Sequence, residues 1–237
     1  ILLKHDLMGG VYHKLLLNTT GKYYATYYTS IPAAWILAGL IVGTQNNSKW
    51  NFEKLQNIES LRILDPSCGS GTLLTGMYMT IKDKYIYDRY ISDIPEELNL
   101  NRFHNIMLEK VLNGWDILEY AGHLTLTSLA LFNPKSTFKH SNIYTMITGL
   151  KNKKIHLGSL DYISGYRREQ MDFFGKGFVD PTVIKIACWQ VSELVPELVD
   201  IVIMNPPFSR SAGKVNIKFG YEKKETMDLM NKQLKEL

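Results

Sequence analysis

Beyond Asn57, short apolar runs recur along the chain, and each ends in a polar residue and is followed by a helical stretch. Repeats of strand, turn and helix are typical of a parallel sheet covered by helices, so we predict an α/β fold. Ligands of such sheets bind beyond the carboxyl ends of the strands, which makes the polar endings candidate site positions. The predicted strands are Leu61–Leu64, ending at Asp65; Val111–Trp115, ending at Asp116; Lys154–Leu157, ending at Gly158 and Ser159; and Asp200–Met204, ending at Asn205.

Apolar residues at helical spacing predict helices around these strands. In the first helix, over His5–Leu17, they recur every four positions. Ser30 followed by Pro32 predicts the start of a second helix, which ends at Gly43. The pattern divides the chain into a helical segment at residues 1–45 and an α/β domain at residues 58–237. Further helices are predicted over Leu73–Ile81, Arg102–Lys110, Ile117–Phe132 and Glu225–Leu237.

The composition narrows the class of protein. Of the 237 residues, 45% are hydrophobic and 21% are charged, which is typical of a soluble globular protein. A net charge of +4 permits a nucleic-acid partner but does not argue for one. The two cysteines form no CxxC pair, so we expect a cytoplasmic location and neither a disulfide scaffold nor a cysteine-based zinc site. The longest apolar stretch, Ile31–Gly43, is shorter than the roughly 20 residues that span a bilayer, so no membrane partner is expected.

A glycine-rich turn follows the first predicted strand. The glycines allow a sharp turn and the close approach of a ligand to the main chain. The turn lacks the lysine of a P-loop and departs from GxGxxG at Leu74, which disfavours a dinucleotide pyrophosphate. Asp65, the first residue of the turn, suits a cationic ligand, and S-adenosylmethionine fits because it carries an amino group and a sulfonium. The alternative interpretation is an ordinary strand-to-helix turn. The turn consists of Asp65, Pro66, Ser67, Cys68, Gly69, Ser70, Gly71 and Thr72, of which Cys68 is expected to be a packing residue rather than a nucleophile.

The acid after the second strand, Asp116, stands 51 residues after Asp65. A carboxylate at a strand tip can accept hydrogen bonds from both ribose hydroxyls of an adenosine. The usual separation from the glycine turn is about 20 residues, so we expect an inserted helix between the two acids. The alternative interpretation of Asp116 is a helix N-cap.

The fourth predicted strand is followed by Asn205, Pro206, Pro207 and Phe208. Consecutive prolines hold the chain extended and donate no hydrogen bonds, which leaves the carbonyl of Pro206 free to accept one. With the side-chain oxygen of Asn205, two acceptors converge on one point, as an exocyclic amine requires. Phe208 is then placed to stack on a base that has been rotated out of a duplex. The alternative is a surface loop after a buried strand.

These motifs, preceded by a segment from Gly21 to Thr29 that contains Tyr28, resemble the adenine-N6 DNA methyltransferases of bacterial restriction–modification systems. The order of the motifs is similar to that of type I modification subunits and fused restriction–modification polypeptides. The resemblance implies a Rossmann-like methyltransferase sheet, incomplete here, with the remaining strands and a target-recognition region further along. It implies S-adenosylmethionine as cofactor, double-stranded DNA with a flipped adenine as partner, a specificity subunit or a fused nuclease or recognition domain, and no metal.

The resemblance also assigns roles by position. Tyr28 and Thr29 would lie by the methionine end of the cofactor, and Asp116 with Ile117 would hold the ribose. Ser159 and Leu160 would flank the adenine ring, although the family often has Asp or Asn where this chain has Ser159, and usually has proline where this chain has Ser30. The turn from Asp65 to Thr72 would wrap the cofactor, and Asn205, Pro206, Pro207 and Phe208 would be catalytic.

Three alternatives stay open at the level of sequence. The same chemistry could act on guanine N2 of ribosomal RNA or on a protein glutamine, although the Tyr-Tyr-Thr segment favours DNA. The chain could also be an inert cofactor- or DNA-binding scaffold that needs a specificity subunit. The stretch between Asp161 and Pro196, with Arg167, Arg168 and several aromatic residues, suits either a DNA-facing loop or a helix packed on the sheet.

Overall fold

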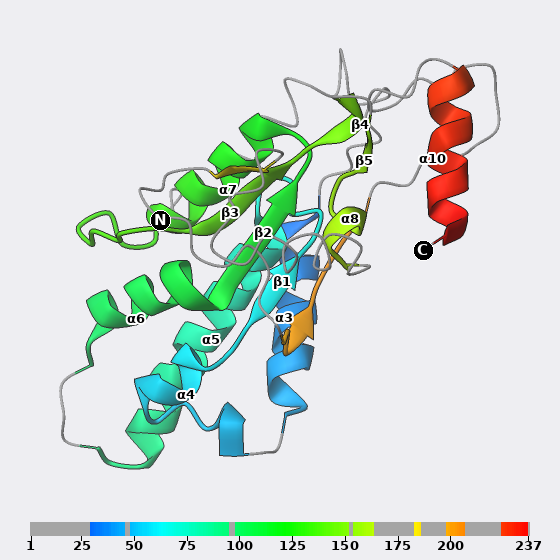
Figure 1. Cartoon of the computed structure of the whole chain (residues 1–237). Coiled ribbons are helices and arrows are strands. Elements are labelled where there is room, and N and C mark those ends of the chain that lie inside the picture. Colours follow the sequence, from blue (N-terminus) through cyan, green and yellow to red (C-terminus); the bar gives the residue numbers. More distant parts are fainter. Residues whose placement is uncertain are drawn as a thin grey trace, which may run out of the picture.

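A five-stranded sheet with helices packed against it forms the centre of the part of the protein that the computed structural model describes (Figure 1). The described residues are 29–45, 48–94, 98–151, 154–163, 183–185, 198–206 and 224–236. The order of the strands in the sheet is β6-β3-β2-β1-β7. The strands are β1 (Ile63–Asp65), β2 (Leu112–Asp116), β3 (Asn142–Met146), β6 (Val183–Lys185) and β7 (Ile201–Val202).

Four neighbouring strands, β3, β2, β1 and β7, run parallel, and β6 pairs antiparallel with β3 at the edge. The predicted mixed α/β class is confirmed at this level, and the arrangement is compatible with a Rossmann-like fold. From β1 the chain continues to β2 and β3 on one side, whereas β7 lies on the other side of β1. The gap between the tips of β1 and β7 is therefore a topological switch point, where ligands of such sheets bind.

The third strand of the parallel sheet differs from the predicted one. Lys154–Leu157 is strand β5, which pairs antiparallel with β4 (Thr148–Lys151) in a separate two-stranded hairpin. The third parallel strand is β3, which the sequence analysis missed. A short apolar run carries no sign of its partner, and two residues between two runs suit a hairpin, whereas parallel strands need a long crossover.

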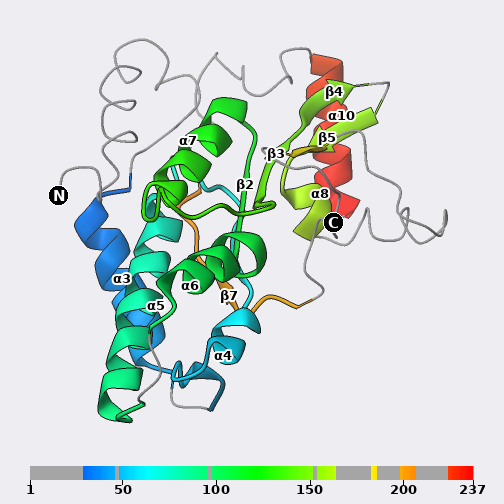
Figure 2. The same cartoon turned by 90° about the vertical axis from the view of Figure 1, so that its left-hand side faces the viewer.

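The helices are arranged mainly on one side of the sheet. Figure 2 shows α3, α5, α6 and α7 on this side, with the β4–β5 hairpin, α8 and α10 on the other. The helices are α3 (Ile31–Gly43), α4 (Leu55–Glu59), α5 (Thr72–Ile91), α6 (Leu100–Ile106), α7 (Glu119–Ala130), α8 (Leu160–Ile163) and α10 (Lys224–Glu236), with a 3₁₀ turn η2 (Ser48–Trp50) and a π turn η3 (Met107–Val111).

Alternating residues of the strands divide the core into two clusters, as the two-residue period of a strand requires. Ile63 of β1 packs with the helices in the larger cluster, whereas its neighbour Leu64 packs with Trp115 and Tyr144 on the opposite face. Helix α3 belongs to the larger cluster through buried Ala34 and Ala38. It approaches α5 so closely that a Cβ at Gly76 would lie 3.1 Å from the carbonyl oxygen of Ala34.

Most described helices match their predicted positions, with differences at the ends. Helix α3 has the predicted bounds, although the side chain of Ser30 makes no capping hydrogen bond. Helix α5 continues ten residues beyond the predicted end at Ile81, and the helix predicted over Arg102–Lys110 is divided between α6 and η3. The helix predicted over His5–Leu17 lies outside the described residues. Within the described ranges, no helix combines the length and apolar character needed to cross a membrane.

Candidate functional site

The polar residues that end the parallel strands gather at the switch point between β1 and β7. Strand β1 ends at Asp65, and the glycine turn leads from there into α5. On the other side of β1, the amide of Ile203 donates to the carbonyl oxygen of Leu64 at 2.9 Å, so Asn205 follows β7 at the same edge. Asp200, just before β7, forms two hydrogen bonds with the backbone of Arg62, just before β1. The amide of Asp200 donates to the carbonyl oxygen of Arg62 at 2.8 Å, and the amide of Arg62 donates to Asp200 Oδ2 at 2.8 Å.

Backbone amides of the glycine turn donate to acceptors of the protein itself. The amide of Ser67 donates to the Asp65 carboxylate at 3.0 Å, and that of Gly69 donates to Asp116 Oδ2 at 2.9 Å. The amide of Cys68 donates to the carbonyl oxygen of Trp115 at 2.8 Å. A phosphate would meet two carboxylates here and would compete with them for these amides. The turn thus has its amides engaged by the protein and two acidic side chains beside it.

Two acids define the electrostatics of this edge. Burial, reinforced by the nearby charge of Asp116, raises the pKa of Asp65 to about 8. Burial also raises the pKa of Asp116, against the hydrogen bonds that its carboxylate accepts from the amides of Leu118 and Gly69. Because the N-cap of α7 is Leu118, Asp116 does not cap that helix directly but connects the end of β2 to the glycine turn. Shifted acids of this kind cluster at functional sites.

Both glycines of the turn have left-handed backbones, with φ of +55° at Gly69 and +84° at Gly71. A Cβ at Gly71 would lie 2.8 Å from the side chain of Thr125 in α7, whereas one at Gly69 would meet nothing within 4 Å. The Thr125 hydroxyl donates to the carbonyl oxygen of Gly69 at 2.9 Å. Gly71 is thus required for packing, whereas the position that a side chain would take at Gly69 is open space. Thr125 was missed by the sequence analysis, since a threonine inside a helix carries no motif.

The remaining side chains of the turn face the protein. Cys68 is buried, and burial raises the pKa of its thiol, so the sulfur stays protonated and inert, in agreement with the predicted packing role. Ser70 and Thr72 are also buried, and their hydroxyl oxygens lie 3.3 Å apart. These buried side chains hold the turn in shape.

The exit of the β4–β5 hairpin lies against the glycine turn, although β5 is not part of the main sheet. The hydroxyl of Ser159 donates to the carbonyl oxygen of Pro66 at 2.6 Å. Ile117 approaches Gly158, where an added Cβ would lie 3.1 Å from its Cγ2 atom. Leu160, the first residue of α8, is 47% exposed beside this contact. Ser159 and Leu160 therefore lie beside the glycine turn, but they follow a strand of the β4–β5 hairpin and not, as predicted, a strand of the parallel sheet.

Asn205 contacts the segment before α3. Its Nδ2 donates to the hydroxyl oxygen of Thr29 at 2.9 Å, and both side chains are half-buried. Pro206, directly after it, is exposed. Two motifs predicted from distant parts of the sequence are thus in direct contact.

Several predicted site residues lie outside the described residues. They are Tyr28 of the segment from Gly21 to Thr29, Pro207 and Phe208 of the motif that begins at Asn205, and Arg167 and Arg168 of the stretch after Asp161. Their predicted roles remain predictions.

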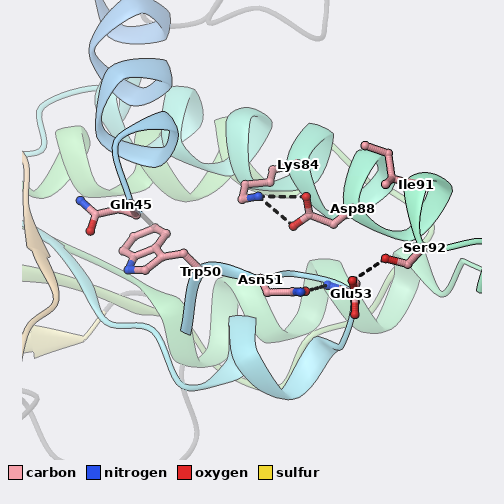
Figure 3. A pocket seen from close by; sticks show the side chains of 8 residues that line it. All are labelled: Gln45, Trp50, Asn51, Glu53, Lys84, Asp88, Ile91 and Ser92. Atoms are coloured by element: carbon pink, nitrogen blue, oxygen red, sulfur yellow. Dashed lines mark hydrogen bonds and ion pairs between the residues drawn. The ribbon is translucent and has the colours of Figure 1, made fainter. Parts of the chain in front are cut away.

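A cleft of about 220 Å³ lies at the far end of α5, one helix length of about 30 Å from the glycine turn (Figure 3). Its polar side chains are engaged with one another: Lys84 pairs with Asp88 at 2.9 Å, and Ser92 donates to Glu53. The acidic side chains of the cleft are thus already paired, whereas Asp65 and Asp116 lie at the carboxyl edge of the sheet, which is the candidate site. The cleft is lined by Gln45, Trp50, Asn51, Glu53, Lys84, Asp88, Ile91 and Ser92.

In comparisons with known proteins, no family model and no curated protein sequence matched the chain.

Proposed function

We propose that the chain binds S-adenosylmethionine at the carboxyl edge of the sheet and transfers its methyl group to adenine N6 in double-stranded DNA, within a restriction–modification system. The observation that carries the proposal is the pairing of β7 with β1. This pairing brings Asn205 and Pro206 to the strand tip next to the Asp65 turn, although 140 residues separate them. An amine-binding pair of acceptors and a turn suited to a cationic ligand thereby share one switch point.

The residues at this edge have chemistry that suits the proposed cofactor. Asp65 and Asp116 offer carboxyl groups that can ionise against a bound cation and accept hydrogen bonds, and the space beside Gly69 is open. When bound, S-adenosylmethionine supplies an electrophilic methyl group. Asn205 Oδ1 and the Pro206 carbonyl would accept the two hydrogens of the target amine and so favour a nitrogen whose lone pair is available to attack. Positioning and these two acceptors would supply most of the rate enhancement.

Methyl transfer tests the proposal directly. The purified chain is incubated with methyl-labelled S-adenosylmethionine and unmethylated DNA, and the digested nucleosides are separated; label is expected in N6-methyladenine. Parallel reactions with ribosomal RNA and a glutamine peptide test the other amines. Label in the ribosomal RNA or the glutamine peptide, and none in the DNA, would contradict DNA as the substrate. A chain that binds no S-adenosylmethionine in calorimetry would contradict the whole proposal.

Replacing Asp116 with alanine is expected to weaken S-adenosylmethionine binding by about 1–3 kcal/mol, because the hydroxyls of the ribose lose their acceptor. Calorimetry measures the affinity. The carboxylate also holds the glycine turn through Gly69, so a control must loosen the turn and keep the acid. Thr125→Val does so, since it removes the bond to the Gly69 carbonyl. Equal losses of affinity in both variants would assign Asp116 a structural role only.

A further inference from the structure

The hydrogen bond between Asn205 and Thr29 joins two well-anchored parts of the fold. Thr29 lies just before α3, whose buried Ala34 and Ala38 pack in the main core. Asn205 lies two residues after Ile203, which is buried and bonded to Leu64 of β1. The contact spans 176 positions of sequence, so it depends on the docking of α3 against the sheet.

The direction of this bond decides which atom of the Asn205 amide remains available. A side-chain amide has one end that donates and one that accepts, and the two have nearly the same shape. Here Nδ2 donates to Thr29 Oγ1 at 2.9 Å, which directs the donating end toward α3 and leaves Oδ1 on the other side. An amine can be bound only by the oxygen, because the NH2 end would repel it.

We propose that Thr29 is a positioning residue that holds the Asn205 amide with Oδ1 toward the target amine. The inference rests on the proposed function and adds to it a role for the segment before α3. The β-branched side chain of threonine is stiff about χ1, so its oxygen is held in one place. Without this hydrogen bond the amide is less restrained, and its oxygen points toward the amine for a smaller share of the time.

Thr29→Val tests the role, because valine keeps the shape of threonine and removes the acceptor. We expect kcat for methyl transfer to fall roughly three- to tenfold, the effect of losing one neutral hydrogen bond, while the Kd of the cofactor stays within about twofold. Thr29→Ser restores the acceptor and is expected to recover most of the rate. Thr44→Val, at the exposed opposite end of α3, is the matched control and should match the wild type.

A second readout needs no activity. The thermal midpoints of Thr29→Val, Asn205→Ala and the double variant form a cycle, and the pair is expected to be non-additive. If the changes in thermal midpoint of the two single variants add up in the double variant, the positioning role is overturned. It is also overturned if Thr29→Val binds the cofactor more weakly at an unchanged kcat; in both cases the proposed function still stands. A wild-type chain that transfers no methyl group would instead overturn the proposed function and the catalytic part of this inference, while the cycle would still report the hydrogen bond.

Discussion

Asn205→Ala is expected to reduce kcat for methyl transfer by at least about a hundredfold, the usual cost of removing one preorganised polar group at a reacting centre. The variant loses the side-chain oxygen that accepts from the target amine, and the Pro206 carbonyl alone cannot hold both hydrogens. Cofactor affinity should stay close to that of the wild type, because Asn205 follows β7 and is not part of the glycine turn. Single-turnover methylation and calorimetry measure the two quantities separately.

The matched control is Asn133→Ala, which removes a half-buried amide whose Nδ2 donates to Asn101 Oδ1. This variant should methylate at the wild-type rate. A large loss of cofactor affinity in Asn205→Ala would contradict the assigned role and would indicate that the asparagine shapes the cofactor site. A rate equal to that of the control would remove Asn205 from the reaction.

Asp65→Asn is expected to stabilise the ligand-free protein by about 5 kcal/mol at pH 8 and to have little effect at pH 4. The pKa of Asp65 is about 8 in the folded protein because the carboxyl group is buried, whereas an unfolded chain has an aspartate pKa of about 3.9. Between these values the unfolded state releases the proton and the folded state retains it. The favourable contribution of Asp65 is thus complete below pH 4 and is lost as the pH rises toward 8.

Urea unfolding at several values between pH 4 and pH 8.5 measures this effect. The wild type should lose stability with rising pH more steeply than Asp65→Asn, whose amide does not titrate and keeps an oxygen for the Ser67 amide. Asp83→Asn, which alters an exposed acid of α5, should follow the wild-type slope. Parallel curves for the wild type and Asp65→Asn would mean that Asp65 is already ionised in the folded protein.

A buried acid that destabilises the free protein is the pattern expected of a site adapted to a ligand. The same substitution is expected to weaken binding of a cationic ligand, because an asparagine cannot ionise when the cation binds beside it. Stability and affinity should therefore change in opposite directions in Asp65→Asn.

The ends of three strands could be predicted from the sequence, because residues that are neighbours in the chain suffice to mark them. Asp65 and Asp116 end β1 and β2 as predicted, and Asn205 lies three residues after β7, since an apolar run and the polar residue that ends it are close together in the chain. It failed at β3, where Asn142–Met146 was missed and Lys154–Leu157 was taken for a parallel strand. Runs of four or five apolar residues look alike, and only their partners distinguish a core strand from a hairpin strand.

The amino-acid order alone determines the glycine turn, the acids beside it and the amide after the last strand, because backbone freedom, charge and hydrogen-bonding capacity belong to single residues and near neighbours. The folded chain determines which of these groups meet. That β7 lies beside β1, that Thr29 reaches Asn205, and that Asp65 is buried deeply enough to hold its proton all depend on contacts between distant segments. Such contacts form through packing of the whole core, which no local pattern encodes.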